Sequence, residues 1–146
     1  LSIPDVGTLM AILIFGGLSL QWPVGMWADR SDRKKVLSYA SLASAFFALL
    51  LSLHLPYSLL LLFAWGFGGF SFTLYALSMA YACEKFQEEE IVAATGGFVL
   101  SYGSGAVLGP LIAPLWMDHL GPTALFLFLA LITALLGLST LPWRKR

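Results

Sequence analysis

Side chains that could contact a solute occur between residues 71 and 78, inside a long stretch without charged residues. Ser71, Tyr75 and Ser78 follow one another at intervals of four and three residues, so a helix would place all three on one face. Two interpretations are open. The hydroxyls could bond to carbonyls of their own or a neighbouring helix, or they could line a wet cavity suited to a neutral or weakly polar solute. Further candidates for such a cavity are Gln21, Tyr102 and Ser104.

Residues that could support catalysis or hold a metal are few. The two histidines, His54 and His119, are far apart in the sequence, and only Asp118 lies beside one of them. A zinc site needs three or four protein ligands. The glycines at 103, 105 and 109 lack the G-x-G-x-x-G spacing, and no G-x-S-x-G, H-E-x-x-H or C-x-x-C motif is present. We therefore expect no enzyme activity, no cofactor and no bound metal.

The hydrophobicity of the chain predicts the helices that position these residues. Hydrophobic residues make up 59% of the sequence and charged residues 11%, too few for a water-facing surface. Four runs lack charge (6–28, 36–83, 91–117 and 119–143), and each exceeds the ~20 residues that span a bilayer as a helix. The second run is long enough for two spans and contains a turn signal around Pro56. The sequence predicts an all-α membrane protein, a single domain covering residues 1–146, with spans at about 8–28, 36–54, 57–82, 91–116 and 122–142.

The basic residues divide cleanly between the two sides of this arrangement. Five spans place every basic residue on one side of the membrane: Arg30, Arg33, Lys34, Lys35, Lys85, Arg144, Lys145 and Arg146. That side is cytoplasmic by the positive-inside rule. We expect a multi-pass protein of the bacterial inner membrane, with the N-terminus of this segment periplasmic and the C-terminus cytoplasmic. Its surroundings are the lipid bilayer, and no nucleic-acid partner is expected.

The first cytoplasmic loop carries the most specific local pattern. A basic loop that merely stops a membrane helix explains Arg33 and Lys34. It does not explain a glycine, Gly25, four residues before an acid, Asp29, which is followed directly by Arg30. A glycine lets another backbone come close, and an acid just past a helix end can accept hydrogen bonds from the N-terminus of a neighbouring helix.

This loop resembles the signature of the major facilitator superfamily, although Asp32 stands where the family often has a second glycine. The segments 72–85 and 100–110 resemble the tenth and eleventh helices of the YcaD-like bacterial branch. The resemblance implies a transporter of two six-helix halves, of which this chain would be helices eight to twelve, an incomplete C-terminal half. It also implies that the loop acts as a conformational latch, with Arg33 or Arg30 within ion-pair reach of Glu84 and Asp29 close by.

Small residues mark the helix faces that could pack closely. On the fourth span they recur every four residues, a spacing that permits close backbone approach in lipid. The stripe runs from Ala93 to Ala113 and includes Gly97, Ser101, Gly105 and Gly109. A weaker stripe on the second span comprises Ala40, Ser44, Ala48 and Ser52.

The preferred function is secondary active transport of a small solute by alternating access, with the missing N-terminal half as partner. Two alternatives remain open. The chain could be a small membrane-embedded interaction or assembly protein that binds through the glycine stripe, or it could be a self-assembling half-transporter.

Overall fold

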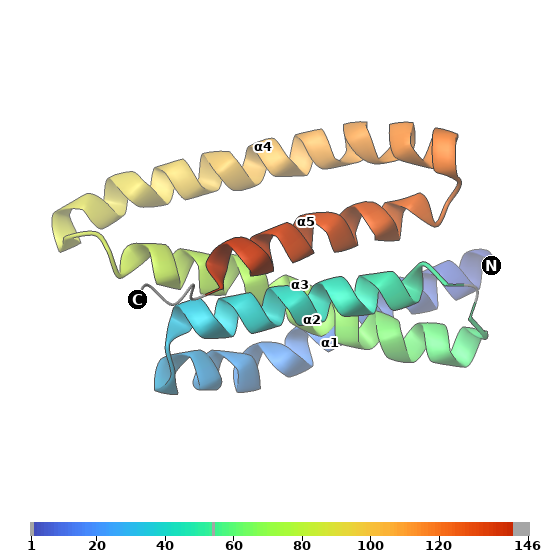
Figure 1. Ribbon diagram of the computed structural model, residues 1–146, viewed down its shortest axis with the longest axis horizontal. Helices are drawn as coiled ribbons and strands as arrows, with labels where there is room; N and C mark the ends of the chain where they lie inside the picture. Colours follow the sequence, from blue (N-terminus) through green and yellow to red (C-terminus); the bar gives the residue numbers. More distant parts are fainter. Residues whose placement is uncertain (1, 54, 142–146) are drawn as a thin grey trace.

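The computed structural model of the chain describes residues 2–53 and 55–141, and this part contains five α-helices and no strand (Figure 1). The helices are α1 (Ile3–Arg30), α2 (Arg33–Leu51), α3 (Tyr57–Cys83), α4 (Glu88–Leu120) and α5 (Ala124–Thr140). The predicted all-α fold is therefore confirmed. His54, Arg144, Lys145 and Arg146, which entered the predicted topology, lie outside the described residues.

Local capping fixes where the helices begin and end. Ser2 and Asp5 form a reciprocal capping box at the start of α1. The Asp32 side chain accepts a hydrogen bond from the Lys34 N–H and begins α2. Pro56 precedes α3, and Gly121 ends α4 with a φ of 83°, a left-handed value that glycine adopts without strain. The helices α1 and α4 extend a few residues beyond the predicted spans at both ends.

Four of the helices, α1 to α4, are long and apolar enough to cross a membrane, whereas α5 is apolar but only 17 residues long. Helix α3 packs against both α1 and α2, and α5 packs against α2. The core lies where α1, α2 and α3 meet, around Val24, Leu37, Ala40, Leu74 and Leu77. Helix α4 stands apart from this group, beside α5, and has few contacts with the other helices (Figure 1).

Helices α1 and α3 cross with their backbones in close contact. A Cβ atom added at Gly16 would fall on the backbone carbonyl of Trp65, and one added at Gly68 would fall on the backbone carbonyl of Leu13. Each helix thus presents a glycine to the backbone of the other, an arrangement that only a hydrogen side chain permits. We call this pair of glycines the α1–α3 crossing.

The stripe of small residues on α2 is also largely buried. Ala40, Ser44 and Ala48 are fully buried within the bundle. Nearby, the Ser38 hydroxyl donates a 2.7 Å hydrogen bond to the Gly137 carbonyl of α5, so α2 is tied to α5 by a buried polar contact as well as by packing.

Candidate functional site

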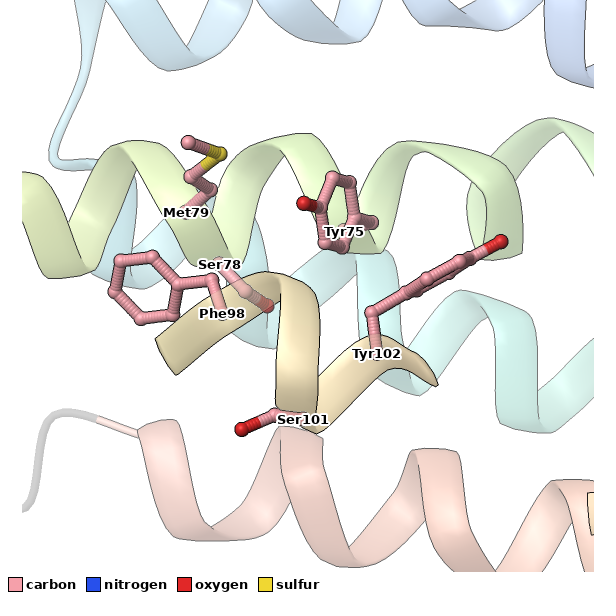
Figure 2. A pocket seen from close by; sticks show the side chains of 6 residues that line it. All are labelled: Tyr75, Ser78, Met79, Phe98, Ser101 and Tyr102. Carbon is pink, nitrogen blue, oxygen red and sulfur yellow. The ribbon is translucent and has the colours of Figure 1, made fainter. Parts of the chain in front are cut away.

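A crevice of about 290 Å³ separates the middle of α3 from α4. Figure 2 shows the six side chains that line it, three from each helix: Tyr75, Ser78, Met79, Phe98, Ser101 and Tyr102. A second hollow of about 580 Å³ adjoins it and is lined by Ser71, Phe72, Tyr75 and Tyr102. The two tyrosines belong to both spaces, so they form the wall between them.

The two tyrosine rings meet across the crevice. The ring centroids of Tyr75 and Tyr102 are 5.1 Å apart and their planes are inclined by 59°, an arrangement that aromatic pairs favour. Both rings remain substantially exposed, at 43% and 63%. They therefore present aromatic surface to any molecule that occupies the space between α3 and α4.

The hydroxyl groups around the crevice fall into two classes. Ser71, Ser101 and Ser104 each donate to the carbonyl four residues earlier in their own helix, so these hydroxyls are satisfied locally. The hydroxyls of Tyr75, Ser78 and Tyr102 have no hydrogen-bond partner within residues 2–53 and 55–141. These three are the polar groups that remain available to a solute.

The structure brings only part of the predicted cavity together. Ser71, Tyr75, Ser78 and Tyr102 are neighbours, as described. Gln21 instead lines a smaller pocket between α1 and α3. Ser104 lies in a shallow depression along α4 with Leu100 and Val107.

Three apolar residues of the crevice and the adjoining hollow were not predicted from the sequence. Met79 lies four residues after Tyr75, Phe98 lies four residues before Tyr102, and Phe72 lies next to Ser71. The four-residue spacing puts Met79 and Phe98 on the faces of the tyrosines. This spacing was visible in the sequence, but a search limited to polar residues passes over it.

A charged cluster connects the loop after α1 to the end of α3. The Arg33 guanidinium lies 3.2 Å from the Glu84 carboxylate and 3.5 Å from that of Asp29. The predicted ion pair with Glu84 is thereby confirmed, and Arg33 is the residue that makes it. In the described part of the chain, Arg30 and Lys34 have no carboxylate within 4.0 Å.

The departure of this loop from the family pattern has a local explanation. Asp32 has a φ of −64°, which any residue adopts, so the turn does not require a glycine there. Its carboxylate caps α2 through the Lys34 N–H, at 3.0 Å. The turn is thus closed by a helix cap.

Gly25 and the glycines of the stripe on α4 were predicted to allow close approach, but none of them meets another helix among the described residues. A Cβ atom added at Gly25, Gly97, Gly105 or Gly109 would have nothing within 4 Å in the described structure. Gly25 opens onto the pocket of about 150 Å³ that also contains Asp29 and Arg33. We call the face of α4 that carries the glycine stripe the α4 stripe face; at Gly97, Gly105 and Gly109 it meets no other helix among the described residues.

Comparison with known proteins gives one family. The model described as Major Facilitator Superfamily matches residues 1–146. An uncharacterised MFS-type transporter YcaD from Escherichia fergusonii is 31% identical over 129 residues, which cover 88% of this chain and 33% of that protein. The YcaD of Salmonella arizonae is 34% identical over 132 residues, with the same coverage. The chain therefore spans about a third of the length of these relatives. No solved structure matches it.

Proposed function

The chain belongs to the Major Facilitator Superfamily, and from this premise we propose that it forms part of a secondary transporter that moves a small solute across the bacterial inner membrane. The mechanism would be alternating access, in which two helical bundles rock about a site near the middle of the membrane. The α3–α4 crevice is the observation that supports a solute site in this segment. It combines two exposed tyrosine rings with three available hydroxyls in the middle of apolar helices.

The chemistry of the crevice favours a neutral or weakly polar solute. Its lining supplies aromatic and sulfur-containing surface, with hydroxyls as the polar groups. No aspartate, glutamate, lysine, arginine or histidine occurs between residues 57 and 83, which form α3 and so the whole of the α3 wall. Intramembrane ionisable groups usually carry coupling protons, so we place proton coupling, if the transporter uses it, outside this segment.

We further propose that the five helices correspond to helices eight to twelve of the transporter, in its C-terminal half. The length of the relatives, about three times that of this chain, supports a larger protein with an N-terminal half as partner. The α4 stripe face is a suitable surface for a helix from the rest of the protein, because small residues allow close approach and nothing in the described chain lies within 4 Å of a Cβ atom added at Gly97, Gly105 or Gly109.

The same surface favours the alternative that the chain is a membrane-embedded interaction protein or a self-assembling half-transporter. In either case the α4 stripe face would bind a separate chain rather than another part of the same polypeptide. The crevice beside it favours transport, because an interaction protein has no need of exposed tyrosines with free hydroxyls between two of its own helices.

The ion pair between Arg33 and Glu84 supports a latch between conformations. Exchanging the charges tests this. Arg33→Glu and Glu84→Arg should each lower transport by the full-length protein several-fold, and the double variant should recover most of it. Partly exposed pairs contribute only ~0–1 kcal/mol, but ~1 kcal/mol changes the ratio of two conformations about fivefold. Initial rates of uptake or efflux in proteoliposomes measure the effect.

Lys85→Glu provides the matched control for this exchange. Lys85 adjoins Glu84, but its ammonium lies over the Tyr81 ring, 4.7 Å from the centroid, and takes no part in the pair. The Lys85→Glu variant should change the transport rate less than Arg33→Glu or Glu84→Arg does. If the double variant transports no better than the worse single variant, Arg33 and Glu84 do not act as a pair.

The orientation remains a proposal, with the end of α1 and the start of α2 on the cytoplasmic side. The ion pair shows that the end of α3 lies at the same end of the bundle, so Lys85 joins the basic loop there. A cysteine at Lys34, in a Cys83→Ser background, should react with a membrane-impermeant maleimide in inverted vesicles and stay unlabelled in intact cells. Rapid labelling in intact cells would reverse the proposed topology.

A further inference from the structure

An exposed aromatic pair flanks the charged loop and is made by residues that take part in neither the crevice nor the ion pair. The rings of Trp27 in α1 and Tyr39 in α2 stack almost in parallel, with centroids 6.0 Å apart and planes inclined by 4°. They are 44% and 51% exposed, so the stack is part of the outer surface of the bundle. Within the described residues, the Trp27 N–H and the Tyr39 hydroxyl have no hydrogen-bond partner, although Trp65 and Tyr57 do.

Helix geometry explains why these two rings meet near the loop. Side chains lean toward the N-terminus of their own helix. Helix α1 runs toward the loop, so Trp27 leans away from it, whereas α2 leaves the loop, so Tyr39 leans back toward it. The two rings come together about one to two helical turns from the loop, the depth at which Trp and Tyr favour a membrane interface.

Two basic residues flank the aromatic pair on the loop side. Arg30 follows Trp27 by three residues and Lys35 precedes Tyr39 by four, so each shares a helix face with its ring. Arg30 has no carboxylate within 4.0 Å in the part of the chain that is described, and the carboxylate near Lys35 is Asp32, at 4.0 Å. Two cations and one acid leave this surface with a net positive charge.

We propose that Trp27, Arg30, Lys35 and Tyr39 form a binding site for the headgroup of an anionic phospholipid. The guanidinium of Arg30 can donate two parallel hydrogen bonds to a phosphate, and Lys35 adds a second cation. The indole N–H and the phenol hydroxyl provide donors at the depth of the glycerol esters. Phe46, seven residues after Tyr39 and exposed, continues the apolar face deeper along α2, where an acyl chain would lie.

Charge and position together identify the occupant. The net positive charge favours an anionic headgroup over a zwitterionic one. A water-soluble phosphate would make no apolar contact with the stacked rings or with the apolar face beyond them, whereas a lipid would contact both. The site depends on neither the transport cycle nor the solute crevice, so it stands or fails independently of the proposed function.

Competition between lipids on the purified full-length protein tests the site. The protein is equilibrated with equal amounts of phosphatidylglycerol and phosphatidylcholine, and the lipids retained are counted by native mass spectrometry. Wild type should prefer phosphatidylglycerol, and Arg30→Gln with Lys35→Gln should reduce that preference about tenfold, since each cation near the membrane surface contributes appreciably. Both side chains are exposed, so the double variant should keep the gel-filtration profile of the wild type. Trp27→Leu should lower retention of phosphatidylglycerol with both cations intact.

Lys85→Gln is the control, because it removes one cation at the same end of the bundle but outside the site. Its preference should equal that of the wild type. If the double variant prefers phosphatidylglycerol as strongly as the wild type does, there is no such site. If Lys85→Gln loses as much of the preference as the double variant, the preference comes from general surface charge, and the proposal is also overturned. Displacement of the lipid by millimolar glycerol 3-phosphate would also overturn it, since the occupant would then be a soluble phosphate.

Discussion

Alanine at Gly16 or Gly68 should markedly lower the yield of folded full-length protein, and leucine at either position should abolish it. At both positions the added carbon would fall on a backbone carbonyl of the facing helix, and a backbone cannot rotate away as a side chain can. The helices must separate to make room, which weakens the packing that joins α1 to α3. Overpacking of this kind typically costs ~1–3 kcal/mol. Gel filtration in mild detergent and thermal unfolding measure the loss.

Gly7→Ala is the matched control for the α1–α3 crossing. Gly7 lies in the same helix as Gly16, but nothing lies within 4 Å of an added Cβ atom. Alanine there should be neutral or stabilise the helix by up to ~1 kcal/mol, because it has the higher helix propensity. If Gly16→Ala and Gly7→Ala have the same unfolding temperature, the crossing does not hold the two helices together.

A glycine substitution of the same kind tests whether the α4 stripe face is an interface. Within the described chain, a Cβ atom added at Gly105 has no neighbour within 4 Å. If a helix from the rest of the transporter packs there, Gly105→Leu should lower the yield of the full-length protein as Gly16→Leu does. A fully stable Gly105→Leu variant would show that the stripe is not an interface.

Loss of the Tyr75 ring should weaken solute recognition by the full-length transporter. An aromatic side chain buries 150–250 Å² on contact, and an aromatic pair adds ~0.5–1.5 kcal/mol, so Tyr75→Ala or Tyr102→Ala should raise the apparent KM by about tenfold or more. Tyr75→Phe keeps the ring and removes one available hydroxyl, so its effect should be smaller, about two- to tenfold. Initial transport rates at matched expression give these values.

Tyr57→Phe serves as the control for the tyrosine variants. Its hydroxyl donates to the Asp5 carbonyl at 3.2 Å, far along α3 from the crevice, and its removal should leave the apparent KM unchanged. Unchanged kinetics in both alanine variants would assign Tyr75 and Tyr102 to helix packing and leave this segment without a solute contact.

Sequence patterns predicted the number and approximate bounds of the helices, because hydrophobic runs, the charged loops between them and the turn signal around Pro56 determine them. They predicted less well which helices touch. The regular stripe around Gly105 indicated an interface, but its glycines meet no helix among the described residues. Gly16 and Gly68, which belong to no such stripe, lie at a contact between two helix backbones. Small residues show where a close approach is possible. They do not identify the partner, which depends on the crossing of helices far apart in the sequence.

For the polar residues of the crevice, too, the sequence predicted one property and the structure was needed for another. Spacing correctly placed Ser71, Tyr75 and Ser78 on one side of α3, but only the structure separates their roles. A serine hydroxyl is short enough to reach the carbonyl four residues earlier, and Ser71 does so. A phenol extends beyond its own helix, so its partner depends on the neighbouring element, here the Tyr102 ring of α4.

The α1–α3 crossing also has a mechanical consequence. Backbone in contact with backbone leaves no compliant side chain between the helices, so we expect α1 and α3 to move together in any tilt, with the pivot near Gly68. At 1.5 Å per residue, Tyr75 lies roughly 10 Å from this point and Glu84 roughly 24 Å. A tilt of about 10° would then displace Glu84 by roughly 4 Å and Tyr75 by roughly 2 Å. If the proposed latch and solute site both hold, α1 and α3 would act together as a lever, and breaking the Arg33–Glu84 ion pair at one end would change the width of the crevice.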